Sequence, residues 1–193
     1  MDIENIIYEF YKPGSVTCEL LLRHGERVAA KSIGIAENLT KNLILINPDM
    51  EFIMEAAMLH DIGIFMTNAP SLGCFGNVPY ICHGLLGRTL LDNLGFPKHG
   101  LVSERHTGAG ITAENIRINA LPLPCRDMIP VSIEEKIICF ADKFYSKNPE
   151  KSGYEKNIPE IIKELELIDK THADRFAVWA EELLAVDKFS LKL

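Results

Sequence analysis

The chain has 193 residues, 47% hydrophobic and 24% charged, so it is long enough to bury an extensive core and has the composition of a globular protein. Its formal net charge of −7 argues against binding to a nucleic-acid polymer, because affinity for phosphate backbones rests on clustered lysine and arginine. No apolar run reaches the roughly 18 residues of a membrane span, and the first residues lack the basic and apolar regions of a signal peptide. We therefore expect a cytoplasmic protein without a membrane partner.

Apolar residues recur mostly at helical spacing from the N-terminus onward. Residues 3–11 predict a short helix that Pro13-Gly14 ends, and residues 17–40 predict a long one. Residues 43–46 are the one segment that resembles a strand. Because this run is short and isolated, we interpret it as a buried connection.

Asp49 can cap the next helix, which carries His60 and Asp61 near its C-terminal end and stops at Gly63. Residues 68–79 predict a loop. Ser132 begins a later helix with a capping-box pattern that pairs it with Glu135. The remaining predicted helices are residues 80–94, 102–106, 133–145, 155–167 and 173–184. These patterns predict an all-α fold.

Cysteines provide no sign of disulfides or of a CxxC metal site. Their number is odd and two of them lie in apolar helical patterns, which favours reduced, buried thiols in a cytoplasmic protein. They are Cys18, Cys74, Cys82, Cys125 and Cys139.

Four histidines and two aspartates form a series with an apolar or glycine-rich setting at each histidine. The steps from His60 to His83 and from His83 to His106 are equal, at roughly one helix plus a connection each. Imidazole and carboxylate ligands together suit iron, manganese, zinc or nickel better than calcium. The candidate ligands are His24, His60, Asp61, His83, His106 and Asp142. His99 and His172 stand outside the series, and we expect them to be packed or solvated.

The neighbours His60 and Asp61 restrict the geometry of such a site. Side chains of adjacent residues on a regular helix point about 100° apart, so both can reach one metal cluster only near a helix end. Gly63 lets the backbone turn there. Because a carboxylate can bridge two cations, we expect Asp61 to be the bridging ligand.

These residues resemble the signature of the HD-domain superfamily, in particular HDIG-type proteins with extra histidines between the His-Asp pair and the final Asp. The resemblance covers residues 24–147. It implies a single helical domain over residues 1–193, with an HD-type bundle at about 17–150 and C-terminal helices at about 155–185 packing on it. The motifs that carry it are His24-Gly25-Glu26-Arg27-Val28, Leu59-His60-Asp61-Ile62-Gly63, His83-Gly84-Leu85-Leu86-Gly87, Glu104-Arg105-His106-Thr107-Gly108 and Ala141-Asp142-Lys143.

The resemblance also implies two divalent transition-metal ions, one held by His24, His60, Asp61 and Asp142 and the other by Asp61, His83 and His106. HD proteins are mostly phosphohydrolases, so we expect hydrolysis of a small phosphorylated or nucleotide-type substrate by a metal-bridging hydroxide, with Asp61 as the catalytic ligand. Basic groups should balance the phosphate oxygens. The candidates for this role are Arg27, Arg105 and Lys143.

One position departs from the family pattern. Many HDIG phosphohydrolases carry Lys or Arg directly after the glycine, whereas this chain has Ile64-Phe65-Met66. Arg88 or Lys143 could supply the missing charge, or the substrate could be less highly charged. The apolar turn also suits a binuclear-iron oxygenase of the same fold, and a metal-binding sensor without turnover is a third possibility. Metal identity, substrate identity and oligomeric state stay open.

Overall fold

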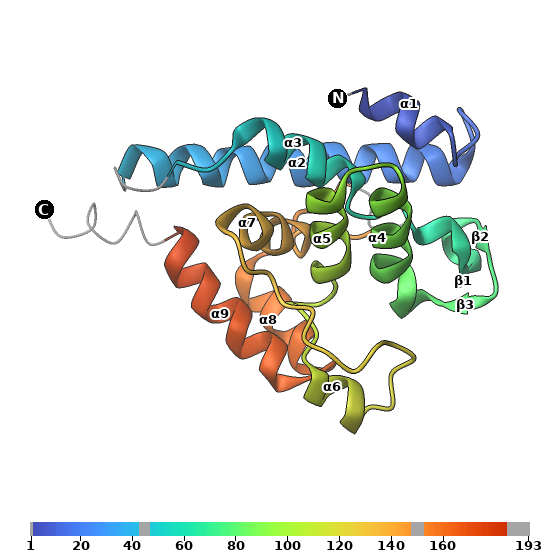
Figure 1. Ribbon diagram of the computed structural model, residues 1–193. Helices are drawn as coiled ribbons and strands as arrows, with labels where there is room; N and C mark the ends of the chain where they lie inside the picture. The colour runs from blue at the N-terminus through green and yellow to red at the C-terminus, as the bar shows by residue number, and fades with distance from the viewer. Residues whose placement is uncertain (1, 43–46, 148–152, 185–193) are drawn as a thin grey trace, which may run out of the picture.

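Helices dominate the structure, a computed structural model that describes residues 2–42, 47–147 and 153–184. The α-helices of this part of the chain are α1 (Ile3–Tyr8), α2 (Val16–Asn42), α3 (Met50–Leu59), α4 (His83–Asn93), α5 (Pro97–Arg105), α6 (Ala113–Ile118), α7 (Ile133–Asp142), α8 (Ile158–Glu166) and α9 (Lys170–Leu184). Helices α2 and α3 pack side by side, and α4, α5 and α7 lie below them in the view of Figure 1. Helix α9 contacts α7 and α8. The predicted predominance of helices is confirmed.

The segment between α3 and α4 differs from the predicted loop. It contains the short helices η1 (Ile64–Met66), η2 (Pro70–Leu72) and η3 (Tyr80–Cys82) and the strands β1 (Thr67–Ala69), β2 (Cys74–Phe75) and β3 (Val78–Pro79). Strand β1 is central, antiparallel to β2 and parallel to β3. Strands of two or three residues are too short to show an alternating apolar pattern, so the sequence could not reveal them.

Two predicted helix starts are confirmed. Asp49 accepts a hydrogen bond from the Phe52 N–H at 3.0 Å, and Ser132 accepts one from the Glu135 N–H at 3.2 Å. The reciprocal half of the predicted capping box differs. The Glu135 carboxylate accepts from the Val131 N–H at 2.8 Å, one residue before the cap.

Other boundaries differ from the sequence-based prediction. Helix α5 begins at Pro97, five residues before the predicted start, because proline is tolerated in the first turn, where its missing N–H is not needed. Helix α6 was not predicted, although Thr112 and Asn115 form a capping box at its start. The connection at residues 43–46 lies outside the described residues.

Two apolar clusters flank the middle of the bundle. We call them the α7 cluster and the α1 cluster after a helix in each. Central members of the α7 cluster are Val28, Ile53, Ile137, Phe140 and Phe176. Central members of the α1 cluster are Ile7, Tyr11, Leu21, Ile62 and Ile64. Helix α2 contributes to both, so the polar residues between Leu21 and Val28 lie where the clusters meet.

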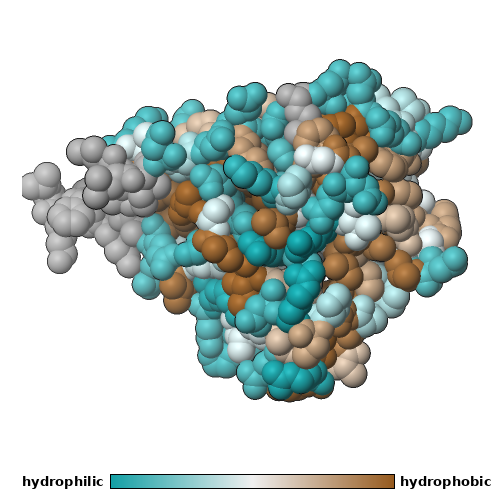
Figure 2. All heavy atoms as spheres, viewed as in Figure 1, coloured by the Kyte–Doolittle hydropathy of each residue, from teal (hydrophilic) through white to brown (hydrophobic). Residues whose placement is uncertain are grey.

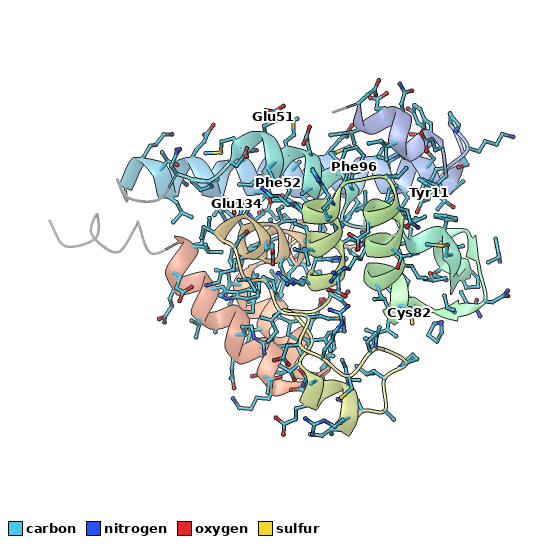
Figure 3. All side chains as sticks on the ribbon, in the orientation of Figure 1. Tyr11, Glu51, Phe52, Cys82, Phe96 and Glu134 are labelled. Carbon is cyan, nitrogen blue, oxygen red and sulfur yellow. The ribbon has the colours of Figure 1, made fainter. Side chains whose placement is uncertain are left out.

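His99 and His172, the two histidines outside the ligand series, are both buried. Rings of Phe52 and Phe96, labelled in Figure 3, lie 4.9 and 5.8 Å from the His99 ring, centroid to centroid. His172 accepts a hydrogen bond from the Ala109 N–H at 2.9 Å. All cysteines are free, and all but Cys125 are buried.

Hydrophilic and hydrophobic residues are intermixed on the face drawn in Figure 2. None of the helices in the described ranges combines the length and the apolar character needed to cross a bilayer.

Candidate metal centre

The six predicted ligands converge in the interior, in two groups that share Asp61. The ligand atoms within each group lie within 4.8 Å of one another, and all six residues are buried. One group is His24, His60, Asp61 and Asp142, and the other is Asp61, His83 and His106. Both groups match the sets implied by the family resemblance.

The two oxygens of Asp61 face different histidines. Oδ2 lies 3.1 Å from His60 Nε2 and 3.5 Å from His24 Nε2. Oδ1 lies 3.4 Å from His83 Nε2 and 3.3 Å from His106 Nε2. One carboxylate therefore presents one oxygen to each group, which is the arrangement that a bridging ligand requires.

Helix ends position most of these side chains. His60 is the C-terminal cap of α3 and Asp61 follows it, so the pair lies at a helix end, as the sequence predicted. His83 begins α4, whereas His106 caps the C-terminus of α5 and Asp142 ends α7. Only His24 among the six lies inside a helix, in α2.

Three imidazoles are oriented by the same local hydrogen bond. In each, Nδ1 donates to the carbonyl three residues earlier: His60 to Ala57 at 2.6 Å, His83 to Tyr80 at 2.7 Å and His106 to Ser103 at 2.7 Å. A proton on Nδ1 leaves Nε2 as an acceptor, which is the form that ligates a metal.

Several acceptor atoms of the cluster have no hydrogen-bond donor beside them. Nε2 of His83 and Nε2 of His106 lie 3.0 Å apart, and two acceptor atoms cannot hydrogen-bond to each other. Within the described part of the chain, His60 Nε2 and both oxygens of Asp61 are buried without a hydrogen-bond partner. Such atoms are costly to bury, and divalent cations would satisfy all of them. The residues present therefore fit two metal ions.

Burial sets most of these side chains in their metal-binding protonation states. It lowers the pKa of His24 to about 4 and that of His83 to about 3, so both imidazoles are neutral at pH 7. Although burial opposes ionisation, the positive charges of His60 and Lys147 hold the pKa of Asp61 well below its usual range. His60 differs: burial opposes its ionisation, but the charges and hydrogen bonds of Asp61 and Asp142 together raise its pKa to about 9.

A second layer of contacts joins the ligand-bearing segments. The Ser103 hydroxyl donates to the His60 carbonyl at 2.7 Å, while the Ser103 carbonyl accepts from His106. The Tyr11 hydroxyl, on the segment after α1 (Figure 3), donates to the Ile62 carbonyl at 2.7 Å. These contacts fix the backbone on both sides of the His-Asp pair.

The predicted phosphate-binding residues lie in different places. Arg27 and His24 line a cavity of about 270 Å³, and Lys143 and Asp142 line a second of about 660 Å³. The Arg105 guanidinium instead bonds both oxygens of Glu135, at 3.0 and 2.9 Å. Arg105 lines neither of these two cavities, and its role in substrate binding stays a prediction.

The structure shows ion pairs of two further basic residues that bear on the site. Arg88, considered as a replacement for the missing basic residue, pairs with Glu104 and with Asp92. Lys147 was not predicted, yet its Nζ lies 2.7 Å from Asp61 Oδ2 and 3.6 Å from Asp142 Oδ1. The turn after α7 places it there, and a lysine in such a connection carries no periodic signal.

Sequence comparison finds relatives of roughly two thirds of this chain. No family model matches the chain. An uncharacterised protein of Methanocaldococcus jannaschii is 37% identical over 61% of this chain and 60% of its own length. The tRNA (cytidine(56)-2′-O)-methyltransferases of Picrophilus torridus and Thermoplasma volcanium are 33% and 28% identical over 66% and 70% of this chain. The chain spans only 32% and 34% of those two enzymes.

Among solved structures, the HD domain of the L. monocytogenes phosphodiesterase PgpH superposes with a TM-score of 0.53. The match covers 98% of this chain and 99% of that domain at 12% sequence identity. At this identity the likeness establishes the fold alone. The chain thus has the fold of an HD domain and, in its interior, a His/Asp cluster of the HD type. The HD-type fold implied by the motifs is confirmed.

Proposed function

We propose that this chain is a metal-dependent phosphohydrolase that acts on a small phosphorylated substrate. The observation that carries the proposal is Asp61, whose two oxygens face separate histidine groups. When bound, two adjacent divalent ions would lower the pKa of a shared water and stabilise the charge on phosphoryl oxygens. Asp61 is the catalytic ligand in this proposal because its carboxylate belongs to both groups.

The cations of the two cavities support a phosphorylated substrate. Arg27 lines the smaller cavity, and Lys143 lines the larger one with its Nζ 2.5 Å from Asp142 Oδ2. Both cavities reach a metal-ligand residue, so an anionic group that contacts the cluster also meets a basic side chain. Charges fixed in place before the reaction stabilise the developing charge of a phosphoryl group better than water does.

The apolar turn after Gly63 gives no support to the oxygenase alternative. Ile64 is fully buried in the α1 cluster and lines neither of the two cavities. Its apolar character therefore serves the core, whereas basic residues line both cavities. A sensor module without turnover would keep the same ligands, so an activity assay has to distinguish it.

Manganese-loaded protein, prepared and assayed without oxygen, tests the proposal. Phosphate release is measured over nucleotides, phosphate monoesters and phosphonates, with 2′- and 3′-phosphorylated nucleotides included because two relatives methylate tRNA at a 2′-hydroxyl. Asp61→Asn keeps the side-chain shape but removes the charge that both groups share. Asp174→Asn is the matched control, because Asp174 pairs with Lys170 on the surface.

We expect oxygen-independent hydrolysis that Asp61→Asn abolishes and Asp174→Asn retains. Activity found only with iron and with stoichiometric O₂ uptake would instead identify an oxygenase. Tight metal binding without turnover on any substrate class would identify a sensor module.

A further inference from the structure

Lys147 stands between the two cavities and the metal ligands. Its side chain is 15% exposed and lines both the 270 Å³ and the 660 Å³ cavity. Its ammonium contacts carboxylate oxygens of Asp61 and Asp142, the two acidic ligands of the first group. Of the basic side chains that line the two cavities, Lys147 is the one that contacts both aspartates of the cluster.

The contact with Asp61 is a close ion pair of poor hydrogen-bond geometry. Nζ lies 2.7 Å from Oδ2, yet this oxygen has no hydrogen-bond partner of acceptable geometry among the described residues. The same oxygen faces His24 and His60, so it is the atom that Asp61 offers to the first metal ion. An ammonium 2.7 Å from this oxygen would stand within a few ångströms of a divalent ion bound to it, and repulsion between the two positive charges would oppose metal binding.

The lysine has room to turn away from the cluster. Its flexible four-carbon stem carries three donors that can be redirected, and both cavities open beside it. A phosphate that meets the metal cluster from either cavity would pass within reach of Nζ. The position directly after Gly63 holds the buried Ile64 and supplies no cation, whereas Lys147 lines both cavities and can bind a phosphate in either one.

We propose that Lys147 is a substrate-binding residue with two positions, one against Asp61 and Asp142 and one turned into the cavities to hold a phosphate oxygen. Metal binding drives it from the first position to the second. The inference rests on the proposed phosphohydrolase function for its ligand class. It adds that the ammonium opposes metal binding and favours phosphate binding, so its removal shifts the two affinities in opposite directions.

Lys147→Met tests the inference, since it keeps the length of the side chain and removes the charge. Calorimetric titration with Mn²⁺ should show metal affinity raised about tenfold or more, because one charge within a few ångströms shifts an ionic equilibrium by one to three powers of ten. Titration of the manganese-loaded protein with inorganic phosphate should show phosphate affinity lowered at least about tenfold for the same reason. Lys147→Arg keeps the charge and should remain close to the wild type in both titrations.

Lys170→Met is the matched control. Lys170 lines neither cavity and pairs with Asp174 on the surface at 2.5 Å, so the variant changes the net charge equally without touching the cluster. Its metal and phosphate affinities should stay within about twofold of the wild type. Unchanged or weaker Mn²⁺ binding in Lys147→Met, or phosphate binding that equals the control, would overturn the inference.

Neither titration needs turnover, so the two proposals fail separately. If the opposite shifts appear while the wild type hydrolyses nothing, the role of Lys147 as a phosphate-binding cation stands and the hydrolase proposal falls. If hydrolysis occurs without these shifts, the role of Lys147 falls alone.

Discussion

Gly63→Ala should destabilise the protein and weaken the second metal group, because Gly63 is where the His-Asp turn meets α4. A Cβ added there would stand 3.0 Å from Gly87 Cα and still closer to the His83 carbonyl oxygen and the Gly87 nitrogen. Ordinary contacts of a Cβ begin at 3.4 Å, and all three of these atoms are backbone. Helix α4 would have to move by roughly 1 Å to restore normal carbon contacts.

Such overpacking typically costs about 1–3 kcal/mol of unfolding free energy. The same displacement carries His83, the first residue of α4, away from Asp61. Metal–ligand distances tolerate only about 0.2 Å, so the group of Asp61, His83 and His106 should lose affinity before the other group does.

Urea unfolding and elemental analysis measure the two effects. Gly34→Ala is the matched control, because Gly34 is exposed within α2 and an added Cβ meets nothing within 4 Å. This control should stabilise the protein by about 1 kcal/mol through helix propensity. The reasoning is refuted if Gly63→Ala is as stable as the control and retains its full metal content.

Two further predictions concern metal content and acid stability. His83→Ala should lose one of two bound metal ions, and Asp61→Ala should lose both. The control His99→Ala, which removes an imidazole paired with Glu55 away from the cluster, should keep both ions. Equal metal content in all variants would count against a binuclear centre. Burial lowers the pKa of His172 from 6.5 to about 4, so the folded protein binds fewer protons than the unfolded chain between these values. The associated stability is present above pH 6.5 and is lost as the pH falls toward 4, by at most about 3 kcal/mol. His172→Asn, whose amide oxygen can still accept from the Ala109 N–H, should flatten this part of the stability–pH curve, and an unchanged slope in urea unfolding would contradict the assignment.

The helices of the centre could be predicted from the sequence because their signals are local. Asp49 and Ser132 cap helices where the polar-to-apolar pattern placed them, and α2 covers the apolar stripe expected after Pro13-Gly14. The sequence did not predict the small sheet, α6 or the first turn of α5. Two-residue strands and a helix begun by proline leave no periodicity to detect.

At Gly63 the sequence correctly predicted that a glycine is needed, but for a different physical reason. The sequence predicted a helix stop that exploits a flexible backbone, but its φ of −83° is accessible to any residue. The helix ends earlier, at Leu59, and glycine is needed because α4 packs directly against its Cα. A close approach between helices is a tertiary fact, so local sequence cannot distinguish it from a turn requirement.

The sequence by itself determined the residues of the candidate metal centre, since their types and their order along the helices can be recognised without the fold. Only the tertiary structure decided which cations accompany it. Arg105 neighbours a ligand in sequence but its charge is taken up by Glu135, whereas Lys147 was not predicted and lies against Asp61. Long charged side chains reach several ångströms from their backbone, so their partners depend on how distant segments pack and not on the position of each residue in the chain.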